Sequence, residues 1–401
     1  DVYKRQIMGD IKLKKGTGIL FVMAVLFISS LIYLHYGDQN TLRVGIFYGS
    51  NWEVPGTVHY EILDQAIKKF ESKYPNVKVE YEKGILSNDY SEWLSEQILK
   101  GTEPDVYLVL DEDFNTLASL GALKNLDMLV GGDKEFDFNV FYSSVYKAGQ
   151  YEGSQYALPM ECNPTLMFVN KTLLQKEGIK VPDNDWTWDD FYDICKTIVK
   201  DSDGDGQMDQ FGCYDYTWLQ AVYSNGITPF NQSGTSSNFL DEKFSQSLEF
   251  VKRLEATNRN YQVTSNDFDL GKVAFRPFTF SDYRTYMPYP WRIKKYSGFE
   301  WTCIRMPAGP SGDNRSEMSA LMAGMSSRTE KKQCAWDFVK LLTTDTDIQK
   351  LVYEDTSAAS VLKSVNTSQD TMNLLNKDTP GDSIIAVSYT HLRAHETLSD
   401  L

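Results

Sequence analysis

The stretch that decides the fold is EILDQAIKKFESKYPNVKVEY, residues Glu61–Tyr81. From Leu63 to Tyr74 its apolar residues recur every three or four positions, the spacing that places them on one face of a helix. Pro75 ends that helix because proline has no N–H to continue it, and Val77–Tyr81 then alternates apolar and polar side chains as a strand does. The stretch therefore predicts a helix followed directly by a strand.

The same alternation of elements extends to either side of this stretch. Leu42–Phe47 (LRVGIF) predicts a strand, Tyr90–Lys100 a second helix, and Pro104–Leu110 (PDVYLVL) a buried strand. Strand, helix, strand, helix and strand in this order predict an α/β fold with an open, mainly parallel sheet. Such sheets bind ligands beyond the carboxyl ends of their strands, so we expect residues 48–52 and 111–113 beside a cleft.

The rest of the chain continues without a repeat or a flexible linker. Residues 149–171 predict a hairpin followed by a long strand, and Thr187 is a suitable N-cap for a further helix. Residues 334–342 begin an amphipathic helix that is expected to continue towards Val352. No Pro-rich or low-complexity block interrupts residues 42–386, so two lobes would have to be joined by several crossing segments.

The composition is that of an acidic, aromatic-rich globular protein. The length of 401 residues fits about two to three domains, and 42% of the residues are hydrophobic and 24% charged. The net charge of −15 repels phosphate backbones, which excludes nucleic acid as the expected partner. The 24 Tyr, 21 Phe and 8 Trp either fill a large core or supply rings that stack on a flat ligand such as a sugar.

Cysteine and histidine usage limits the chemistry. The five cysteines are dispersed and predict small buried hydrophobic residues, although one pair could bridge; they are Cys162, Cys195, Cys213, Cys303 and Cys334. Of the four histidines, His35 flanks an apolar segment, and His391 and His395 lie in the C-terminal tail. His59 is then the single histidine left for the globular part of the chain. One histidine cannot form a multi-histidine zinc site, and any catalytic triad would have to use this residue.

The N-terminal region has the pattern of an export segment. Residues 19–34 are apolar apart from two serines, and Lys12, Lys14 and Lys15 precede them, which should hold the N-terminus in the cytoplasm. Residues 8–38 are therefore expected to form a basic tail and a membrane anchor or signal segment, with the remainder exported.

The extreme ends are expected to be non-native. Residues 1–7 precede a natural start at Met8, and residues 387–401 resemble translated adapter sequence. The four-residue spacing of His391 and His395 mimics a helical metal pair, which we interpret as a coincidence within that tail.

The most specific local motif is DSDGDGQMD at residues 201–209. Side-chain oxygens at loop positions 1, 3, 5 and 9, with Gly206 at position 6, match the first part of an EF-hand calcium loop. Position 12 should be a bidentate Glu but is Gly212, so a calcium shell would need further oxygens. The alternative is an acidic surface turn. The expected ligands of a structural Ca²⁺ are Asp201, Asp203, Asp205, Gln207 and Asp209.

Several segments together resemble the family 1 extracellular solute-binding proteins of bacterial ABC importers, the maltose-binding-protein-like sugar type. The resemblance covers residue 42 to about residue 365, and it rests on the order and spacing of the segments rather than on any one of them. The segments are YPNVKVEY, GTEPDVYLVL with LGALKNLD, YALPMECNPTLMFVNKTLL, WTWDDF, GKVAF and GMSSRTEKKQCAWDFVKLLTTDTDIQKLV.

The resemblance implies a two-lobed, type II periplasmic-binding-protein-like α/β fold, each lobe an open, mainly parallel sheet flanked by helices, with a hinge between the lobes. Lobe I would comprise residues 42–157 and 315–357, and lobe II residues 158–314 and 358–386. In the family further helices follow the last crossing, so lobe II is expected to be truncated.

Candidate ligand contacts follow from the expected cleft and from the resemblance. Trp52 follows the first strand, and Trp218 lies in a segment that resembles the one whose aromatic residue lines the family's sugar site. For any single ring, packing is an equal alternative. The aromatic candidates are Trp52, Trp218, Tyr283 and Trp291, and the polar candidates are Asp111, Glu112, Glu161, Asn225 and Arg276.

The function implied by the resemblance is that of a binding protein. We expect an extracytoplasmic, monomeric solute-binding protein, attached to the outer face of the membrane, that captures a sugar or oligosaccharide by hinge closure and delivers it to the ABC permease without an organic cofactor. One alternative is a membrane-tethered sensor. A glycoside hydrolase is a second alternative; it would need two carboxylates across a cleft, and no pair stands out.

Overall fold

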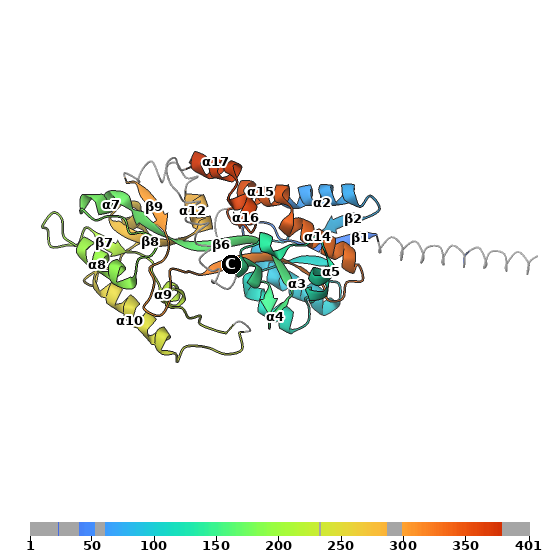
Figure 1. Cartoon of the computed structure of the whole chain (residues 1–401), viewed down its shortest axis with the longest axis horizontal. Helices are drawn as coiled ribbons and strands as arrows, with labels where there is room; N and C mark the ends of the chain where they lie inside the picture. The colour runs from blue at the N-terminus through green and yellow to red at the C-terminus, as the bar shows by residue number, and fades with distance from the viewer. Residues whose placement is uncertain (1–22, 24–39, 53–60, 232–233, 287–298, 379–401) are drawn as a thin grey trace, which may run out of the picture.

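The helix and strand predicted by the deciding stretch are both present. α2 spans Glu61–Lys73 and buries Leu63, Ala66 and Phe70, and β2 spans Lys78–Tyr81. They belong to a two-lobed α/β molecule (Figure 1). The computed structural model describes residues 23, 40–52, 61–231, 234–286 and 299–378.

The remaining elements follow in alternation along the chain. The other strands are β1 (Thr41–Gly45), β3 (Val106–Val109), β4 (Gln150–Tyr151), β5 (Ser154–Gln155), β6 (Ala157–Asn170), β7 (Phe211–Cys213), β8 (Val273–Thr279), β9 (Trp301–Ile304), β10 (Met318–Met325) and β11 (Ala359–Ser360). The other helices are α3 (Ser87–Lys100), α4 (Asp111–Ser119), α5 (Asp127–Gly132), the 3₁₀ turn η1 (Phe138–Val140), α6 (Ser143–Lys147), α7 (Lys171–Lys176), α8 (Trp188–Ile198), α9 (Trp218–Ser224), α10 (Glu242–Ala256), α11 (Ser265–Asp269), α12 (Phe280–Tyr286), α14 (Lys332–Thr344), α15 (Thr346–Asp355), α16 (Lys363–Asn366) and α17 (Gln369–Asp378).

A nine-stranded sheet runs through the molecule in the order β2-β1-β3-β10-β6-β8-β7, and β9 and β11 also pair with β6. β1 is parallel to β2 and β3, and β7 is parallel to β8. β10 and β6 run antiparallel to their neighbours. The expected parallel arrangement therefore holds towards the two ends of the sheet. The central strands depart from it because they carry the chain from one lobe to the other and back.

The strand β6 joins the two lobes. We call lobe I the part built on β1–β3 with α2–α5, α14 and α15, and lobe II the part built on β7–β9 with α7–α11. Residues Ala157–Pro164 of β6 pair with β10, and Thr165–Val169 pair with β8. All 14 residues of β6 are buried. A single continuous strand therefore contributes to the sheets of both lobes, which lie at its opposite ends (Figure 1).

Three apolar cores hold the described elements. The lobe I core includes Phe70 and the fully buried Trp336. The lobe II core includes Trp188, whose ring stacks on Phe250 with the ring centroids 4.2 Å apart. A third core between them contains Tyr283 together with side chains of α15, α16 and α17. The crossing region therefore has an apolar core of its own.

The amphipathic helix that begins near Cys334 is shorter than its pattern predicts. α14 ends at Thr344, and Asp345 accepts hydrogen bonds from backbone N–H groups of the next turn. An aspartate in this position caps a new helix in preference to continuing the old one. The expected run towards Val352 is therefore corrected to two helices, α14 and α15.

Some expectations lie outside the described residues. These are the export segment apart from Met23, the four histidines, Trp291, and residues 379–401. Within the ranges that are described, none of the helices combines the length and the apolar character needed to cross a bilayer. The five cysteines are described; all are free and four are buried, which fits the role of small hydrophobic residues.

Candidate ligand-binding cleft

The carboxyl ends of β1 and β3 meet at the edge of lobe I that faces the crossing strands. Because β1 and β3 are parallel, the segments that follow them emerge at the same edge of the sheet. β1 leads to Ser50, Asn51 and Trp52, and β3 leads to Asp111 at the start of α4. This edge brings two predicted groups of ligand candidates to one side of the sheet.

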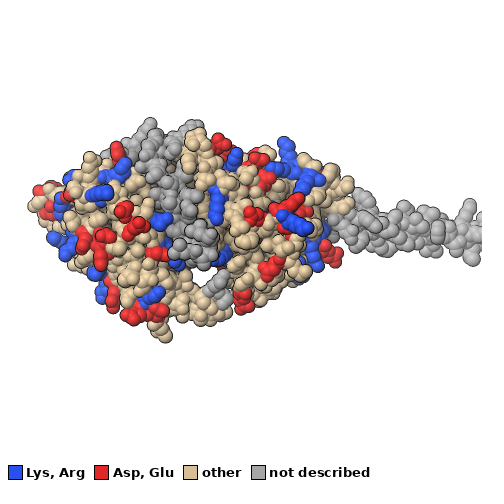
Figure 2. All heavy atoms as spheres, viewed as in Figure 1, with Lys and Arg blue, Asp and Glu red and all other residues tan. Residues whose placement is uncertain are grey.

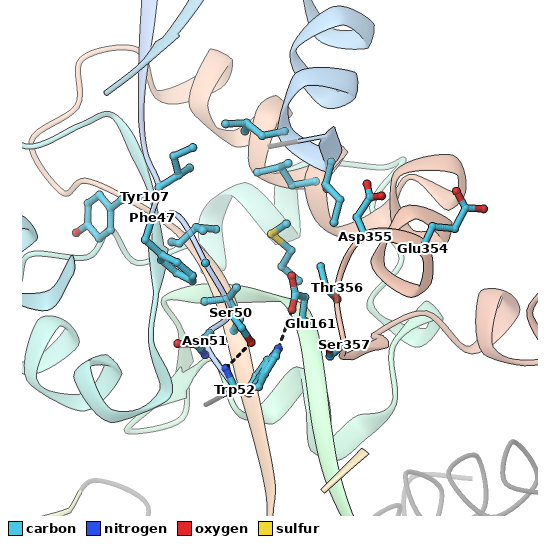
Figure 3. A pocket seen from close by; sticks show the side chains of 18 of the residues that line it. Phe47, Ser50, Asn51, Trp52, Tyr107, Glu161, Glu354, Asp355, Thr356 and Ser357 are labelled. Carbon is cyan, nitrogen blue, oxygen red and sulfur yellow. Dashed lines mark hydrogen bonds between the residues drawn. The ribbon is translucent and has the colours of Figure 1, made fainter. Parts of the chain in front are cut away.

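Trp52 is fixed by hydrogen bonds rather than left free. Its backbone N–H donates to Ser50 Oγ at 3.0 Å, and its indole Nε1–H donates to Glu161 Oε2 at 3.0 Å (Figure 3). Glu161 lies on β6, so this bond joins lobe I to the crossing strand. The indole is half-buried and its orientation is set before any ligand arrives. Such a ring offers a rigid apolar face.

Glu161 is a buried carboxyl at the crossing. Its side chain belongs to a residue only 5% exposed. Burial raises the pKa of Glu161 to about 7, because the charged form loses its water, while hydrogen bonds from Trp52 and the Thr356 hydroxyl act in the opposite direction. Near neutral pH this carboxyl is therefore both an acceptor and a donor of hydrogen bonds.

A cavity of about 310 Å³ lies beside these groups (Figure 3). Its apolar lining comes mostly from the core of lobe I, and the Trp52 ring and the hydroxyls of Ser50 and Thr356 also line it. Three carboxyls, those of Glu161, Glu354 and Asp355, and one guanidinium, that of Arg284, are among the described lining groups. An apolar cavity with a few converging polar groups is typical of small-molecule sites.

Asp111 faces the space between the lobes. Its side chain keeps solvent-accessible surface, yet the protein around it removes enough hydration to raise the pKa of Asp111 to about 6. The charge of Glu112 raises this pKa further, and a hydrogen bond from the Ser319 hydroxyl opposes it. A carboxyl on the wall of a cleft keeps accessible surface and is also partly desolvated, because protein lies close to it on several sides without covering it. Asp111 has both properties.

Lobe II and the returning strand complete this wall. Burial raises the pKa of Tyr223, on α9, and the charges of Glu317 and Asp111 raise it further. The Tyr223 hydroxyl therefore lies within electrostatic range of a carboxyl from lobe I and another from the start of β10. Glu317 accepts a weak bond from Thr165 Oγ1 at 3.5 Å, and its Oε2 is buried without a hydrogen-bond partner among the described residues.

Two further predicted residues lie on elements of lobe II. Trp218 is the first residue of α9 and is 41% exposed, with its ring 5.8 Å from that of Phe244. Arg276, on β8, places its guanidinium 4.0 Å from the centroid of the Phe278 ring. Trp218 is thus available at the surface, whereas Arg276 is held among aromatic rings.

Asn225 and Tyr283 are in the protein interior. Asn225 has no exposed surface; its Nδ2 donates to the Lys243 carbonyl at 2.9 Å and its Oδ1 accepts from Ser311 N–H at 3.1 Å. Tyr283 is 1% exposed and lies against aromatic rings that include Trp301. Both side chains therefore contribute to packing in this structure. The remaining aromatic candidate, Trp291, lies outside the described residues.

The acidic loop brings together three of its five predicted ligands. Carboxylate oxygens of Asp201, Asp203 and Asp209 lie within 4.8 Å of one another. The loop also satisfies its own carboxylates, since Asp201 accepts from the N–H groups of Gly204 at 2.6 Å and Gly206 at 2.7 Å. These bonds lower the pKa of Asp201. The cluster is compact and partly exposed, and it follows α8 in lobe II, whereas Trp52 follows β1 in lobe I.

The sequence did not single out five residues near the cleft. Glu317 and Ser319 lie at the start of β10, where the chain was expected to return to lobe I. Polar residues at that crossing could therefore have been chosen as ligand candidates. Nothing in the sequence distinguishes the other three from ordinary surface or packing residues. These are Tyr223, Arg284 and Thr356.

Two lobes joined by crossing strands, with a fixed tryptophan and desolvated carboxyls between them, define a hinged ligand-binding protein. The comparisons specify the family. The family model described as bacterial extracellular solute-binding protein matches residues 55–348, well over half of the chain, and the chain belongs to this family. Its members bind solutes and are not enzymes, which agrees with the expectation of a binding protein and argues against the hydrolase alternative.

Individual relatives are more distant. A multiple sugar-binding protein from Streptococcus mutans is 28% identical over 138 residues, which cover 34% of this chain and 30% of that protein. An ABC substrate-binding protein from Listeria monocytogenes, solved with cycloalternan, is 21% identical with a TM-score of 0.59, covering 88% of this chain and 86% of that one. The sugar-binding protein MalE from Xanthomonas citri is 16% identical with a TM-score of 0.67, covering 89% and 93%. At these identities the solved structures establish the fold.

Proposed function

We propose that the chain is the solute-binding protein of an ABC importer and that its solute is a sugar or oligosaccharide. The observation that carries the proposal is the rigid Trp52–Glu161 pair at the cleft of a chain that belongs to the solute-binding family. A sugar presents an apolar ring face and a rim of hydroxyls, which match a tryptophan face and nearby carboxyls. The names of the similar proteins from Streptococcus mutans and Xanthomonas citri support the same solute class.

Capture would proceed by closure of the lobes on the ligand. Asp111 belongs to lobe I and Tyr223 to lobe II, and the two are close enough to interact electrostatically. A sugar that donates hydrogen bonds to Asp111 and contacts Tyr223 would stabilise the closed arrangement by its higher affinity for that state. The crossing segments β6, β10 and β11 are the places where backbone angles would change during closure.

Delivery would require a membrane partner. In this proposal the closed monomer docks on the permease subunits through surfaces of both lobes, and the apolar residues 19–34 hold the protein at the outer face of the membrane. Acidic and basic side chains alternate over the visible face of both lobes without a large basic patch (Figure 2). That distribution is compatible with a protein partner rather than with nucleic acid.

Tryptophan fluorescence of the full chain tests the sugar assignment. We would titrate it with a panel of neutral mono- and oligosaccharides, and we expect a saturable change from at least one of them. Trp52→Phe should remove most of this change, because the reporting indole lies at the cleft. Trp93→Phe, a substitution of a half-buried indole on α3, is the matched control and should leave it intact. A folded protein that responds to no sugar would contradict the proposal.

We also propose that the acidic loop binds a structural Ca²⁺. Asp201, Asp203 and Asp209 supply a compact set of carboxylates, which are ligands that Ca²⁺ prefers. Asp205 and Gln207 would join the shell through loop adjustment or through water. Calorimetric titration with Ca²⁺ should show one site in the wild type and none in Asp201→Asn. Equal heats from both proteins would contradict this assignment.

A further inference from the structure

The charges that face the cleft come from several separate elements. Asp111 lies at the start of α4, Glu317 precedes β10, and Glu161 lies on β6. Each carboxyl is at least partly desolvated, and the buried Glu317 Oε2 has no hydrogen-bond partner among the described residues. The charges of two of these groups, Glu317 and Asp111, raise the pKa of Tyr223 on α9 of lobe II, so its hydroxyl lies within electrostatic range of both. The ligand therefore meets an array of acceptors rather than a balanced set of charges.

Basic side chains do not neutralise this array within the described part of the chain. The charges that act on Asp111 and on Tyr223 are those of Glu112, Glu317 and Asp111 itself. Arg315 is close in sequence to Glu317, but its Nε and Nη2 donate to Asp313 at 2.7 and 2.6 Å.

Two other arginines already have partners within the protein. The guanidinium of Arg276 lies over the Phe278 ring and acts electrostatically on Asp215. Arg284 lines the cavity, where its Nη2 donates to the Tyr353 carbonyl at 2.6 Å, and Glu354 and Asp355 line the same cavity. The sum of the described charged groups around the site is therefore negative.

We infer that the cleft selects its ligand by charge: it admits neutral and amine-bearing sugars and rejects sugars that carry a carboxylate or phosphate, with Asp111 and Glu317 as the discriminating residues. This inference rests on the proposed function. An anionic sugar would have to approach unpaired carboxylates in a site that lobe closure dries further, where like charges repel strongly. Hydroxyl and ammonium donors would instead supply the hydrogen bonds that these carboxyls lack.

The experiment compares ligands that differ in charge alone. The probes are α-1,4- and β-1,4-linked tetramers of glucose, of glucosamine and of glucuronic acid, titrated calorimetrically into the full chain at pH 7.5. In whichever linkage series binds, we expect the glucuronate tetramer to bind about a hundredfold or more weakly than the glucose tetramer, as like-charge contacts at an interface imply. The glucosamine tetramer should bind at least as well as the glucose tetramer.

Variants assign the discrimination to the named residues. The double substitution Asp111→Asn with Glu317→Gln keeps hydrogen-bonding groups of similar size but removes two charges. It should reduce the difference in affinity between the glucose and glucuronate tetramers to about tenfold or less. Glu330→Gln removes one exposed charge outside the cleft and should leave the ratio unchanged. High salt should narrow the ratio only slightly, because partly buried charges are poorly screened.

The outcomes are distinguishable. Tight binding of a glucuronate tetramer to the wild type, or a ratio that the double substitution leaves unchanged, would overturn the charge inference while the sugar assignment stands. Failure of the folded chain to bind any tetramer or any sugar of the fluorescence panel would overturn the sugar assignment, and the charge inference with it.

Discussion

Carboxyl groups in two regions of the molecule are perturbed in opposite directions. In the cleft, burial raises the pKa of Glu161 to about 7. In the acidic loop at residues 201–209, backbone N–H groups of Gly206 and Gly204 lower the pKa of the partly exposed Asp201. The loop supplies donors to its own carboxylates. In the cleft, burial outweighs the hydrogen bonds that Glu161 accepts from Trp52 and Thr356, and the buried Glu317 Oε2 has no donor among the described residues. Of the two regions, the cleft is therefore the one whose carboxyl oxygens can still accept hydrogen bonds from a hydroxyl-rich ligand.

The largest expected effect is on stability, and it comes from a substitution that would complete the calcium-loop sequence at residues 201–212. Gly212→Glu restores the missing twelfth ligand in sequence, but Gly212 lies in buried β7, where an added Cβ would be 2.3 Å from the Cβ of Cys195. We expect a loss of about 3 kcal/mol or more in the free energy of unfolding, from overpacking and a buried charge. Urea denaturation measures it. Gly132→Glu, at an open helix end, should be nearly neutral, and wild-type stability of Gly212→Glu would contradict the described packing.

The next effect concerns the pH dependence of stability. Because the folded-state pKa of Glu161 lies above its ordinary value of 4.5, the folded protein retains a proton that the unfolded chain has lost between pH 4.5 and 7. Stability should therefore fall as the pH rises through this window, by up to about 3 kcal/mol from this group. Glu161→Gln should remove that part of the slope in urea denaturation at a series of pH values, and Glu330→Gln should retain it. An unchanged slope in Glu161→Gln would show that this carboxyl is not perturbed.

A smaller effect is expected from the removal of one of the two donors that Glu161 has. Trp52→Phe removes the indole N–H that donates at 3.0 Å. At pH 8, where the carboxyl is ionised, we expect a loss of about 1–2 kcal/mol in the free energy of unfolding. At pH 5 the loss should be smaller, since the carboxyl is then neutral. Equal losses at both pH values would mean that ring packing, not the hydrogen bond, is responsible.

The smallest effect belongs to the acidic loop. The pKa of Asp201 is lowered, so its contribution to stability is present above its ordinary pKa and is lost as the pH falls through the folded-state value. Asp201→Asn should accelerate amide hydrogen exchange at Gly204 and Gly206, whose N–H groups it binds, and leave exchange around Glu161 unchanged. Exchange that changes equally in both regions would remove the contrast between them.

Local features of the fold could be predicted from the sequence. α2 and β2 follow from spacing and one proline, and Thr187 is the N-cap of α8 as expected. Trp52 and Asp111 could be placed at one edge because parallel strands end together. These inferences need only neighbours in sequence or one rule of sheet topology.

The contacts between side chains of the two lobes could not be predicted in the same way. Asp111 and Glu317 come within electrostatic range of Tyr223 only through the relative placement of α4, β10 and α9, which no local pattern encodes. Conversely, Asn225 has the character of a ligand-binding residue, yet its amide is used by the backbone at Lys243 and Ser311. A polar side chain has the same letter in the sequence whether it bonds to a ligand or to the protein.

The shared strand β6 limits how this protein can be recombined. Since Ala157–Pro164 pairs with β10 and Thr165–Val169 with β8, a chimera that joins this lobe I to a relative's lobe II must reproduce both registers within one strand. A cut within β6 would leave each half with an incomplete sheet, so neither fragment should fold alone. Thermal scanning calorimetry should accordingly record a single cooperative transition for both lobes.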